Sequence, residues 1–412
     1  MKDPAVLNAD SECDLRQAQV RTGWGRAAVV MTVIGLGIRL GLSFVSVGTN
    51  DTYTWQKFGW MVGQFGLADA YHHDRLLNHP PIPTLWAYFC HLLEPRDPQG
   101  FAFWMRLPAI LSDVAVCLLL WLTVNARFNA KRAFMAVCIF ALSPAAILIS
   151  AFHCNTDSVC VMLMLWALFL GDRKRWLATG VVLSLAINIK LIPVLIIPGC
   201  LACCSKRKLP ILMTGLAIGV IPFLVLASAS GTQAIKNIVG YDSSYENWGV
   251  VALLRACAIT GLAPEAFFQA AWNYHDLYGK WLMLAMIAIT PFWRVRRAGL
   301  LETGSQAAAW FVGLAPGFGI QYLIYASTPM LAVSPRWGLY VTAACGAFAA
   351  SVYFVFLDST SPARSYFITI YPNATAVFGG LAWATILTYA ATCFVTNLFA
   401  RSGDGTTVSS HD

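Results

Sequence analysis

An acidic residue stands just past the first long apolar segment of this chain. Residues 27–47 are apolar and long enough to cross a bilayer, and Asp51 follows in the polar run GTNDTYTW. A carboxylate at the mouth of a membrane span is costly to hold there, so by default it marks a functional-site hypothesis. The alternative is an acid that merely decorates a helix end at the interface. In a crevice between a loop and the helices, Asp51 could act as a general base.

The motif NHPPIP lies further along the same polar stretch. It places Asn78 and His79 directly before Pro80 and Pro81. Proline fixes the backbone and can start a helix without the donors that stay unpaired at a helix start. We therefore expect a rigid turn here, with Asn78 and His79 as candidate substrate contacts.

The segment FHCNTDSV adds His153 and Asp157 to the candidates. It follows the third apolar segment and opens the fourth. Asp157 or Thr156 could simply cap the helix that starts there, because short polar side chains accept from its free N–H groups. Asp157 is also expected on the same membrane face as Asp51, which favours a role in a site. Both roles can hold together.

Lys190 lies between two apolar half-helices in INIKLIPVLIIPG. A lysine in such a place is costly unless it finds an anion or extends its stem towards the lipid headgroups. A phosphate contact would suit it, because the ammonium group is a compact point charge. The sequence leaves both interpretations open.

Four further polar residues complete the candidates for donor binding. The stretch VGYDSSYENWGV and the segment QYLIY combine aromatic and polar side chains, which suits sugar recognition and equally an interfacial aromatic belt. An outer-face arginine in STSPARSYF is more often plain surface than site. The four residues are Tyr241, Arg255, Gln321 and Arg364.

The composition is that of a membrane protein. Of 412 residues, 58% are hydrophobic and 12% are charged, against about 25% charged in a soluble domain. The net charge of +8 comes from short basic clusters between apolar segments, which orient the protein and do not indicate nucleic-acid binding. The CLACC run lacks a second ligand pair at zinc spacing. Nothing in the sequence calls for a soluble cofactor, and a divalent metal stays possible but unsupported by any motif.

The apolar segments predict an all-α, polytopic membrane bundle of about twelve transmembrane helices, with helical extracytoplasmic loops. The predicted spans are residues 27–47, 101–124, 133–152, 157–171, 176–189, 191–204, 209–229, 277–293, 303–319, 320–334, 337–357 and 374–399.

The basic clusters predict the orientation, because Lys and Arg near span ends favour the cytoplasmic side. NARFNAKR, GDRKR, SKRK and RVRR all face the cytoplasm only if the short segment 81–94 does not cross. We therefore expect 81–94 on the outer surface as an amphipathic helix. The predicted organisation is a cytoplasmic tail without the core of a signal peptide, one transmembrane domain with two long outer loops, and a second cytoplasmic tail: residues 1–26, 27–400 (loops 48–100 and 230–276) and 401–412.

Together, these motifs resemble the GT-C superfamily of integral-membrane glycosyltransferases, and most of all its polyprenyl-phosphate-sugar enzymes of the mannosyltransferase type. The resemblance covers roughly residues 27–335. It rests on the order of an acid after the first span, HPP, RLPAILSD, an outer NTD, a Lys–Pro hairpin and QYLIY. Many relatives carry paired acids in the first motif, whereas Asn50 and Thr52 flank Asp51 here. Many also carry a large C-terminal soluble domain, which we do not expect in this chain.

The resemblance implies a lipid-phosphate sugar donor and catalysis on the extracytoplasmic side, with Asp51 as general base and Asp157 at the second acidic position. We expect transfer of a hexose, such as mannose, from a polyprenyl-phosphate carrier to a hydroxyl of a lipid or glycan acceptor. Outer cations would offset charge on the leaving phosphate. The candidate cations are His79, His153, Lys190, Arg255 and Arg364.

Two other classes of protein share this composition. A transporter or flippase of lipid-linked sugars tends to show inverted repeats and broken helices near the midplane. No repeat is visible here, and the ionisable groups gather on one face. A structural membrane subunit would leave the outer polar set unexplained. We expect a bacterial plasma membrane rather than endoplasmic reticulum, because a glycan on the acceptor sequon at Asn50 would crowd the proposed base.

Overall fold

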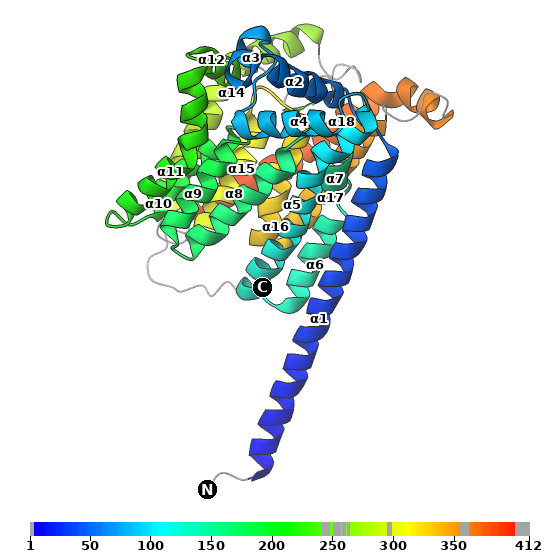
Figure 1. Cartoon of the computed structure of the whole chain (residues 1–412). Coiled ribbons are helices and arrows are strands. Elements are labelled where there is room, and N and C mark those ends of the chain that lie inside the picture. The colour runs from blue at the N-terminus through cyan, green and yellow to red at the C-terminus, as the bar shows by residue number, and fades with distance from the viewer. Residues whose placement is uncertain are drawn as a thin grey trace.

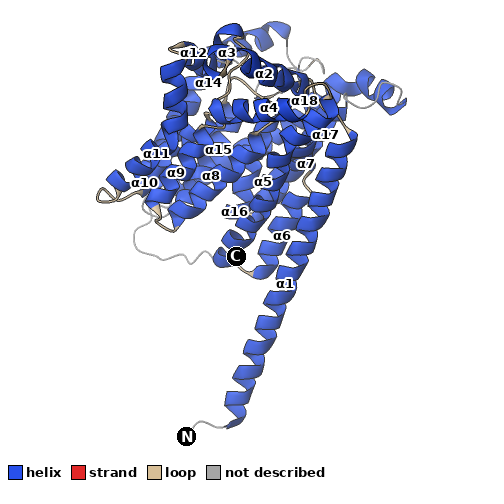
Figure 2. Ribbon diagram, in the orientation of Figure 1, coloured by secondary structure: helices blue, strands red, loops and turns tan. Residues whose placement is uncertain are grey.

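The computed structural model of the chain describes residues 4–240, 248–249, 257, 261, 264–294, 299–354 and 362–399. Every regular element within these ranges is a helix, and Figure 2 shows no strand among them. A helix satisfies its own backbone hydrogen bonds, which is what an apolar segment needs in order to cross a bilayer singly. The prediction of an all-α membrane bundle is confirmed.

Long apolar helices form the body of the bundle. By length and composition, four of the described helices can span a membrane. They are Gly23–Val45 within α1 (Pro4–Val45), α5 (Pro98–Arg127), α11 (Leu209–Ala229) and Ala376–Thr396 within α18 (Pro362–Phe399). A fifth candidate is the pair α6 (Ala130–Ala141) and α7 (Pro144–Ala151), which is bent by 50°. The bend falls where Ser143 caps a helix that begins at a proline.

The remaining helices of the body fall short of a full span in length or in hydropathy. They are α8 (Asp157–Asp172), α9 (Trp176–Ile187), η1 (Ile192–Ile196) with α10 (Ile197–Cys203), α14 (Glu265–Arg294), α15 (Leu300–Leu314), η2 (Ile320–Tyr322) with α16 (Leu323–Val333), and α17 (Pro335–Tyr353). They coincide with predicted apolar segments. The number of about twelve spans therefore stays a prediction.

A layer of short helices covers one end of the bundle (Figure 1). This end layer consists of α2 (Asp51–Phe65), α3 (Leu67–His73), α4 (Pro81–Leu93) and α12 (Gln233–Val239). The segment predicted not to cross forms α4, which lies across the bundle end and packs on α2 (Figure 1). A separate apolar cluster that includes Trp55, Tyr71 and Phe101 joins the end layer to α5. The loop expected over 48–100 is therefore largely helical.

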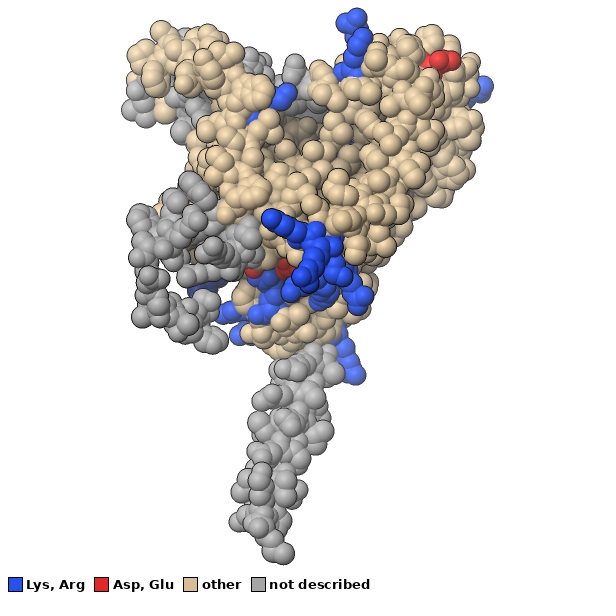
Figure 3. All heavy atoms as spheres, turned by 90° about the vertical axis from the view of Figure 1, so that its left-hand side faces the viewer, with Lys and Arg blue, Asp and Glu red and all other residues tan. Residues whose placement is uncertain are grey.

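Basic side chains gather at the opposite end of the bundle, as Figure 3 shows. At the last turn of α5, Arg127 pairs with Asp172, 3.3 Å away, and with Glu302, which links α5, α8 and α15. By the positive-inside rule this end faces the cytoplasm and the end layer faces outwards. That sidedness stays a prediction.

A buried ion pair ties the first helix to the bundle. Arg39 donates from Nε to Asp113 at 2.7 Å and from Nη1 to the carbonyl of Ala141 at 2.7 Å. Breaking a buried pair by removing one partner typically costs about 3–5 kcal/mol, because the other charge is left uncompensated. Asp113, the acid of the RLPAILSD motif, is therefore a structural partner of α1.

Candidate active site

A cavity of about 330 Å³ opens between the end layer and the bundle. Its walls come from α2, the turn before α4, the segment between α7 and α8, the turn between α9 and η1, and η2. The sequence-predicted residues in its lining are Asp51, Asn78, His79, Lys190 and Gln321. The fold thus brings together candidates from four distant parts of the chain.

The turn that presents Asp51 is held by a buried arginine. Arg106 in α5 donates to the carbonyls of Ser46 at 2.7 Å and Phe152 at 3.0 Å, and also to that of Val47. Between these partners, the chain leaves α1 and starts α2 at Asp51. The arginine of the RLPAILSD motif therefore positions the first-loop acid through the backbone.

Gly48 makes this turn possible. Its φ is +87°, a conformation that side chains with a Cβ rarely adopt. A Cβ at this position would lie 2.0 Å from the carbonyl oxygen of Phe152 and 2.1 Å from Nη2 of Arg106. Glycine is therefore required in GTND for steric and conformational reasons alike.

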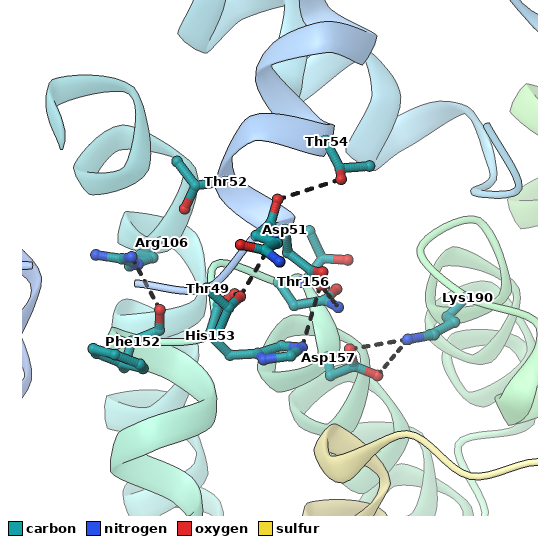
Figure 4. A network of polar contacts seen from close by, with 12 residues as sticks. Thr49, Asp51, Thr52, Thr54, Arg106, Phe152, His153, Thr156, Asp157 and Lys190 are labelled. Carbon is teal, nitrogen blue, oxygen red and sulfur yellow. Dashed lines mark hydrogen bonds and ion pairs between the residues drawn. The ribbon is translucent and has the colours of Figure 1, made fainter. Parts of the chain in front are cut away.

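The Asp51 carboxylate is 39% exposed and reaches the cavity. Its Oδ2 lies 3.2 Å from Nε2 of His153 (Figure 4). The same oxygen accepts from Nδ2 of Asn155 at 3.3 Å. Burial raises the pKa of Asp51. The imidazole of His153 and the charge of Lys190 lower it, and together the lowering effects outweigh burial, so this pKa lies below its ordinary value. The group is an ionised acceptor at neutral pH, as a general base must be.

Lys190 is neither free nor extended towards lipid headgroups. Its Nζ donates to both carboxylate oxygens of Asp157, at 2.8 and 2.9 Å (Figure 4), and lies 5.2 Å from the ring centre of Tyr322. The snorkelling interpretation does not apply, because the ammonium group lines the cavity. A cation fixed in this way can meet an anion without reorganising.

Asp157 is fully buried at the start of α8. It accepts from Tyr325 Oη at 3.0 Å in addition to Lys190, and no side chain caps the helix at Thr156. The capping interpretation is therefore not borne out. Asp157 does not line the cavity, and it acts on the site through Lys190.

His79 is held beside Asp51 by the end layer. Its ring lies 4.4 Å from that of Trp55, and its carbonyl accepts from Tyr71 Oη at 2.5 Å. Burial, with Lys190 nearby, lowers the pKa of His79 to about 3. The ring is neutral at neutral pH, so His79 is a hydrogen-bonding group there and does not supply the cation that we expected. Asn78 lines the cavity next to it.

The other candidates have different positions. His153 lies behind Asp51, outside the cavity lining, and Gln321 lines the cavity from η2. Tyr241 and Arg255 lie outside the described residues, and Arg364 lies in the first turn of α18, where the side chains are not described.

Asn155 and Tyr325 are among the residues of this site that were not predicted from the sequence. Both stand within motifs that were noticed for another residue, NTD and QYLIY. Asn155 lines the cavity, and Tyr325 holds Asp157 from behind. The signal that could have indicated them is their place in these motifs, each beside a residue that was already a candidate.

The site has one carboxylate in its described lining, Asp51. Among the described residues, no group of three or more His, Cys, Asp and Glu side chains could hold a metal ion. The second acid, Asp157, is already bound to Lys190 through both oxygens.

The sequence matches a family model, dolichyl-phosphate-mannose-protein mannosyltransferase, over residues 78–228. The matched range holds the NHPPIP turn, the NTD motif and Lys190. The resemblance to GT-C membrane glycosyltransferases is confirmed. The search of curated proteins found no match to this chain.

The solved structures that are similar to this chain include two of ArnT from Cupriavidus metallidurans. The apo structure is 15% identical, with a TM-score of 0.47, over 92% of this chain and 78% of ArnT. The structure bound to undecaprenyl phosphate is 14% identical, with a TM-score of 0.46, over 92% of this chain and 79% of ArnT.

Proposed function

We propose that this protein transfers a hexose, such as mannose, from a polyprenyl-phosphate donor to a hydroxyl group of a lipid or glycan acceptor. The observation that carries the proposal is the cavity that an ionised Asp51 and the fixed cation Lys190 line together. A family model whose name includes a dolichyl-phosphate-mannose donor matches the part of the chain that supplies Lys190. Transfer takes place on the extracytoplasmic side of a bacterial plasma membrane and needs no soluble cofactor.

The proposed reaction is a single displacement at the anomeric carbon. Asp51 removes the proton of the acceptor hydroxyl while its oxygen attacks C1, a role typically worth about 10²–10⁴-fold. The bond between C1 and the phosphate oxygen breaks, and its electron pair leaves with the polyprenyl phosphate. Lys190 stabilises the charge that develops on that oxygen. The amides of Asn78, Asn155 and Gln321 are available to hydrogen-bond the sugar hydroxyls.

The test is a transfer assay in membranes with radiolabelled polyprenyl-phosphate mannose and glucose, with and without EDTA. We predict that Asp51→Asn lowers turnover about 10²-fold or more while donor binding and expression stay near wild type. Asp69→Asn is the control, because Asp69 is an exposed acid on α3 and does not line the cavity.

Three results would contradict parts of the proposal. Activity of Asp51→Asn within about threefold of wild type would remove Asp51 from the role of base. Passage of intact lipid-linked sugar across the membrane, with no transfer to any acceptor, would instead identify a transporter. Loss of activity in EDTA would show that the reaction needs a metal.

A further inference from the structure

The short segment His153–Asp157, which leads from α7 to the first residue of α8, contacts both charged groups of the cavity. Cys154, buried in its middle, has a φ of 63°, which non-glycine residues rarely adopt. This turn lets His153 and Asn155, on either side of Cys154, both reach the Asp51 carboxylate. The carbonyl of His153 accepts from Thr49 Oγ1 at 2.7 Å, so the segment is also tied to the turn before Asp51.

The contact of His153 with Asp51 leaves the ring few other partners. His153 is 8% exposed, and neither of its buried ring nitrogens makes a hydrogen bond of good geometry within the described residues, so Nε2 meets Asp51 as an ion-pair contact. Its ring packs edge-on against Tyr353 at 5.5 Å. Because a buried polar ring is costly without a partner, the 3.2 Å approach of Nε2 to Asp51 is the interaction that accounts for a histidine here.

The other end of the segment contacts the cation. Asp157 binds Lys190 through both oxygens and is fixed in turn by Tyr325. Its side chain is fully buried, whereas that of Lys190 is 13% exposed. The pair therefore points its positive end at the cavity and its negative end into the bundle.

We propose that the segment His153–Asp157 is a positioning element that sets the distance between base and cation. His153 and Asn155 hold the Asp51 carboxylate, and Asp157, held by Tyr325, aims Lys190. The inference rests on the proposed function. The physical reason is that a misplacement of about 1 Å in a reacting group can cost about 10²-fold in rate, and one short segment links both groups rigidly.

The pH dependence of transfer tests the first part of this proposal, that His153 holds the Asp51 carboxylate. The titratable groups that face Asp51 are His153, His79, Lys190, Cys154 and Tyr353. Of these, His153 is the nearest and lowers the pKa of Asp51 the most, against the opposing effect of burial. His153→Gln keeps a hydrogen-bond donor but removes the imidazole that lowers the pKa of Asp51, so the acid limb of kcat/KM should move to higher pH.

The matched control for this experiment is His73→Gln. His73 is an exposed histidine of the end layer that does not line the cavity. It should leave both the rate and the acid limb unchanged. An acid limb of His153→Gln that coincides with wild type would overturn the role of His153, since a purely structural loss lowers the rate at every pH alike.

A double-mutant cycle tests the second part of the proposal, that Asp157 orients Lys190. Asp157→Asn should raise the donor KM and lower kcat/KM by about tenfold to a hundredfold. In the Lys190→Met background it should have no further effect, because Asp157 acts only through Lys190. Independent, additive losses would overturn the role of Asp157. Monodispersity in detergent identifies any variant that fails to fold. In that case Tyr325→Phe, which removes the hydrogen bond to Asp157 and keeps the ring, replaces Asp157→Asn in the cycle.

The two levels of inference can fail separately. If wild type transfers no sugar from either donor, or Asp51→Asn stays active, the proposed function fails. The positioning role alone fails in a different case. There wild type is active and Asp51→Asn is not, but His153→Gln leaves the acid limb unchanged and the losses in the double-mutant cycle are additive.

Discussion

At the scale of single residues, each charged side chain of the site contacts an oppositely charged or a polar side chain. Asp51 lies against His153, and Lys190 is bound by Asp157. Partnered charges near a membrane keep fixed positions at a lower desolvation cost than isolated ones. The same pairing makes the site sensitive to changes that remove one partner only.

The lowered pKa of Asp51 predicts the acid side of the activity profile. A base works in its ionised form, so activity is present above the pKa of the folded protein and lost as the pH falls through it. Since this pKa lies below the usual value of about 3.9, we expect kcat/KM to hold down to about pH 4. His79, with its pKa lowered to about 3, stays neutral over the same range. A pH profile with buffers of constant ionic strength measures this, and an acid limb centred near about pH 6.5 would point to a histidine instead.

Lys190→Met is expected to impair transfer and folding together. Loss of the ammonium group removes the proposed phosphate contact and leaves Asp157 buried without its countercharge, at a cost of about 3–5 kcal/mol. The donor KM should rise or kcat fall, and the thermal midpoint should drop.

The double variant Lys190→Met with Asp157→Asn separates these two effects. It should recover part of the stability and none of the activity. Lys280→Met is the control, because Lys280 is exposed on α14. Equal, small effects of the two single lysine substitutions would show that Lys190 has no special role.

At the scale of elements, short turns rather than long helices place the reactive groups. Asp51 starts α2 directly after a turn held by Arg106, and Lys190 lies in the turn between α9 and η1. The Pro80–Pro81 pair starts α4 and leaves Asn78 and His79 at the cavity wall. The helices supply a rigid frame on which these turns are mounted.

Gly48→Ala is predicted to disrupt the turn that presents Asp51. The added Cβ would lie 2.0 Å from the Phe152 carbonyl oxygen at a φ of +87°, and strain of this kind costs about 1–3 kcal/mol before the clash is relieved. We expect a drop in the thermal midpoint and a fall in kcat larger than that caused by Gly66→Ala. Gly66 also has a positive φ, of +82°, but a Cβ there would meet nothing within 4 Å. Equal losses for the two variants would show that backbone conformation alone matters.

At the scale of the whole molecule, the candidate site and the cluster of basic side chains lie at opposite ends of the bundle. The end layer and the cavity occupy one end, and Lys and Arg gather at the other (Figures 1 and 3). The positive-inside rule assigns the basic end to the cytoplasm. A lipid-linked donor could then place its phosphate at the outer interface with its tail between the helices.

Cysteine labelling in intact cells tests this sidedness. In a background from which accessible native cysteines have been removed, a cysteine in the turn at 125–132 should react only after permeabilisation. A cysteine at exposed Leu92 on α4 should react from outside. The reason is that α4 lies across the bundle end (Figure 1), and we therefore expect it to stay on the membrane surface. Labelling of 125–132 from outside would reverse the orientation and with it the proposed side of catalysis.

Local patterns in the sequence were enough for the class of fold and for much of the site. Hydropathy is a property of neighbouring residues, so apolar segments identified the helices, and an acid beside a span identified Asp51. The Pro80–Pro81 pair likewise indicated a rigid turn at Asn78 and His79. These predictions needed no knowledge of which helices pack together.

Only the tertiary structure decided which charges meet. Asn155 and Asp51 are 104 positions apart, and Lys190 and Asp157 are 33 apart, so no local pattern could pair them. Helix packing turned Lys190 from a lone cation into half of an ion pair and removed the charge from His79 by burial. The residue types that can do chemistry follow from the sequence alone. Their charge states and partners follow from burial and distance, which exist only once the helices are packed.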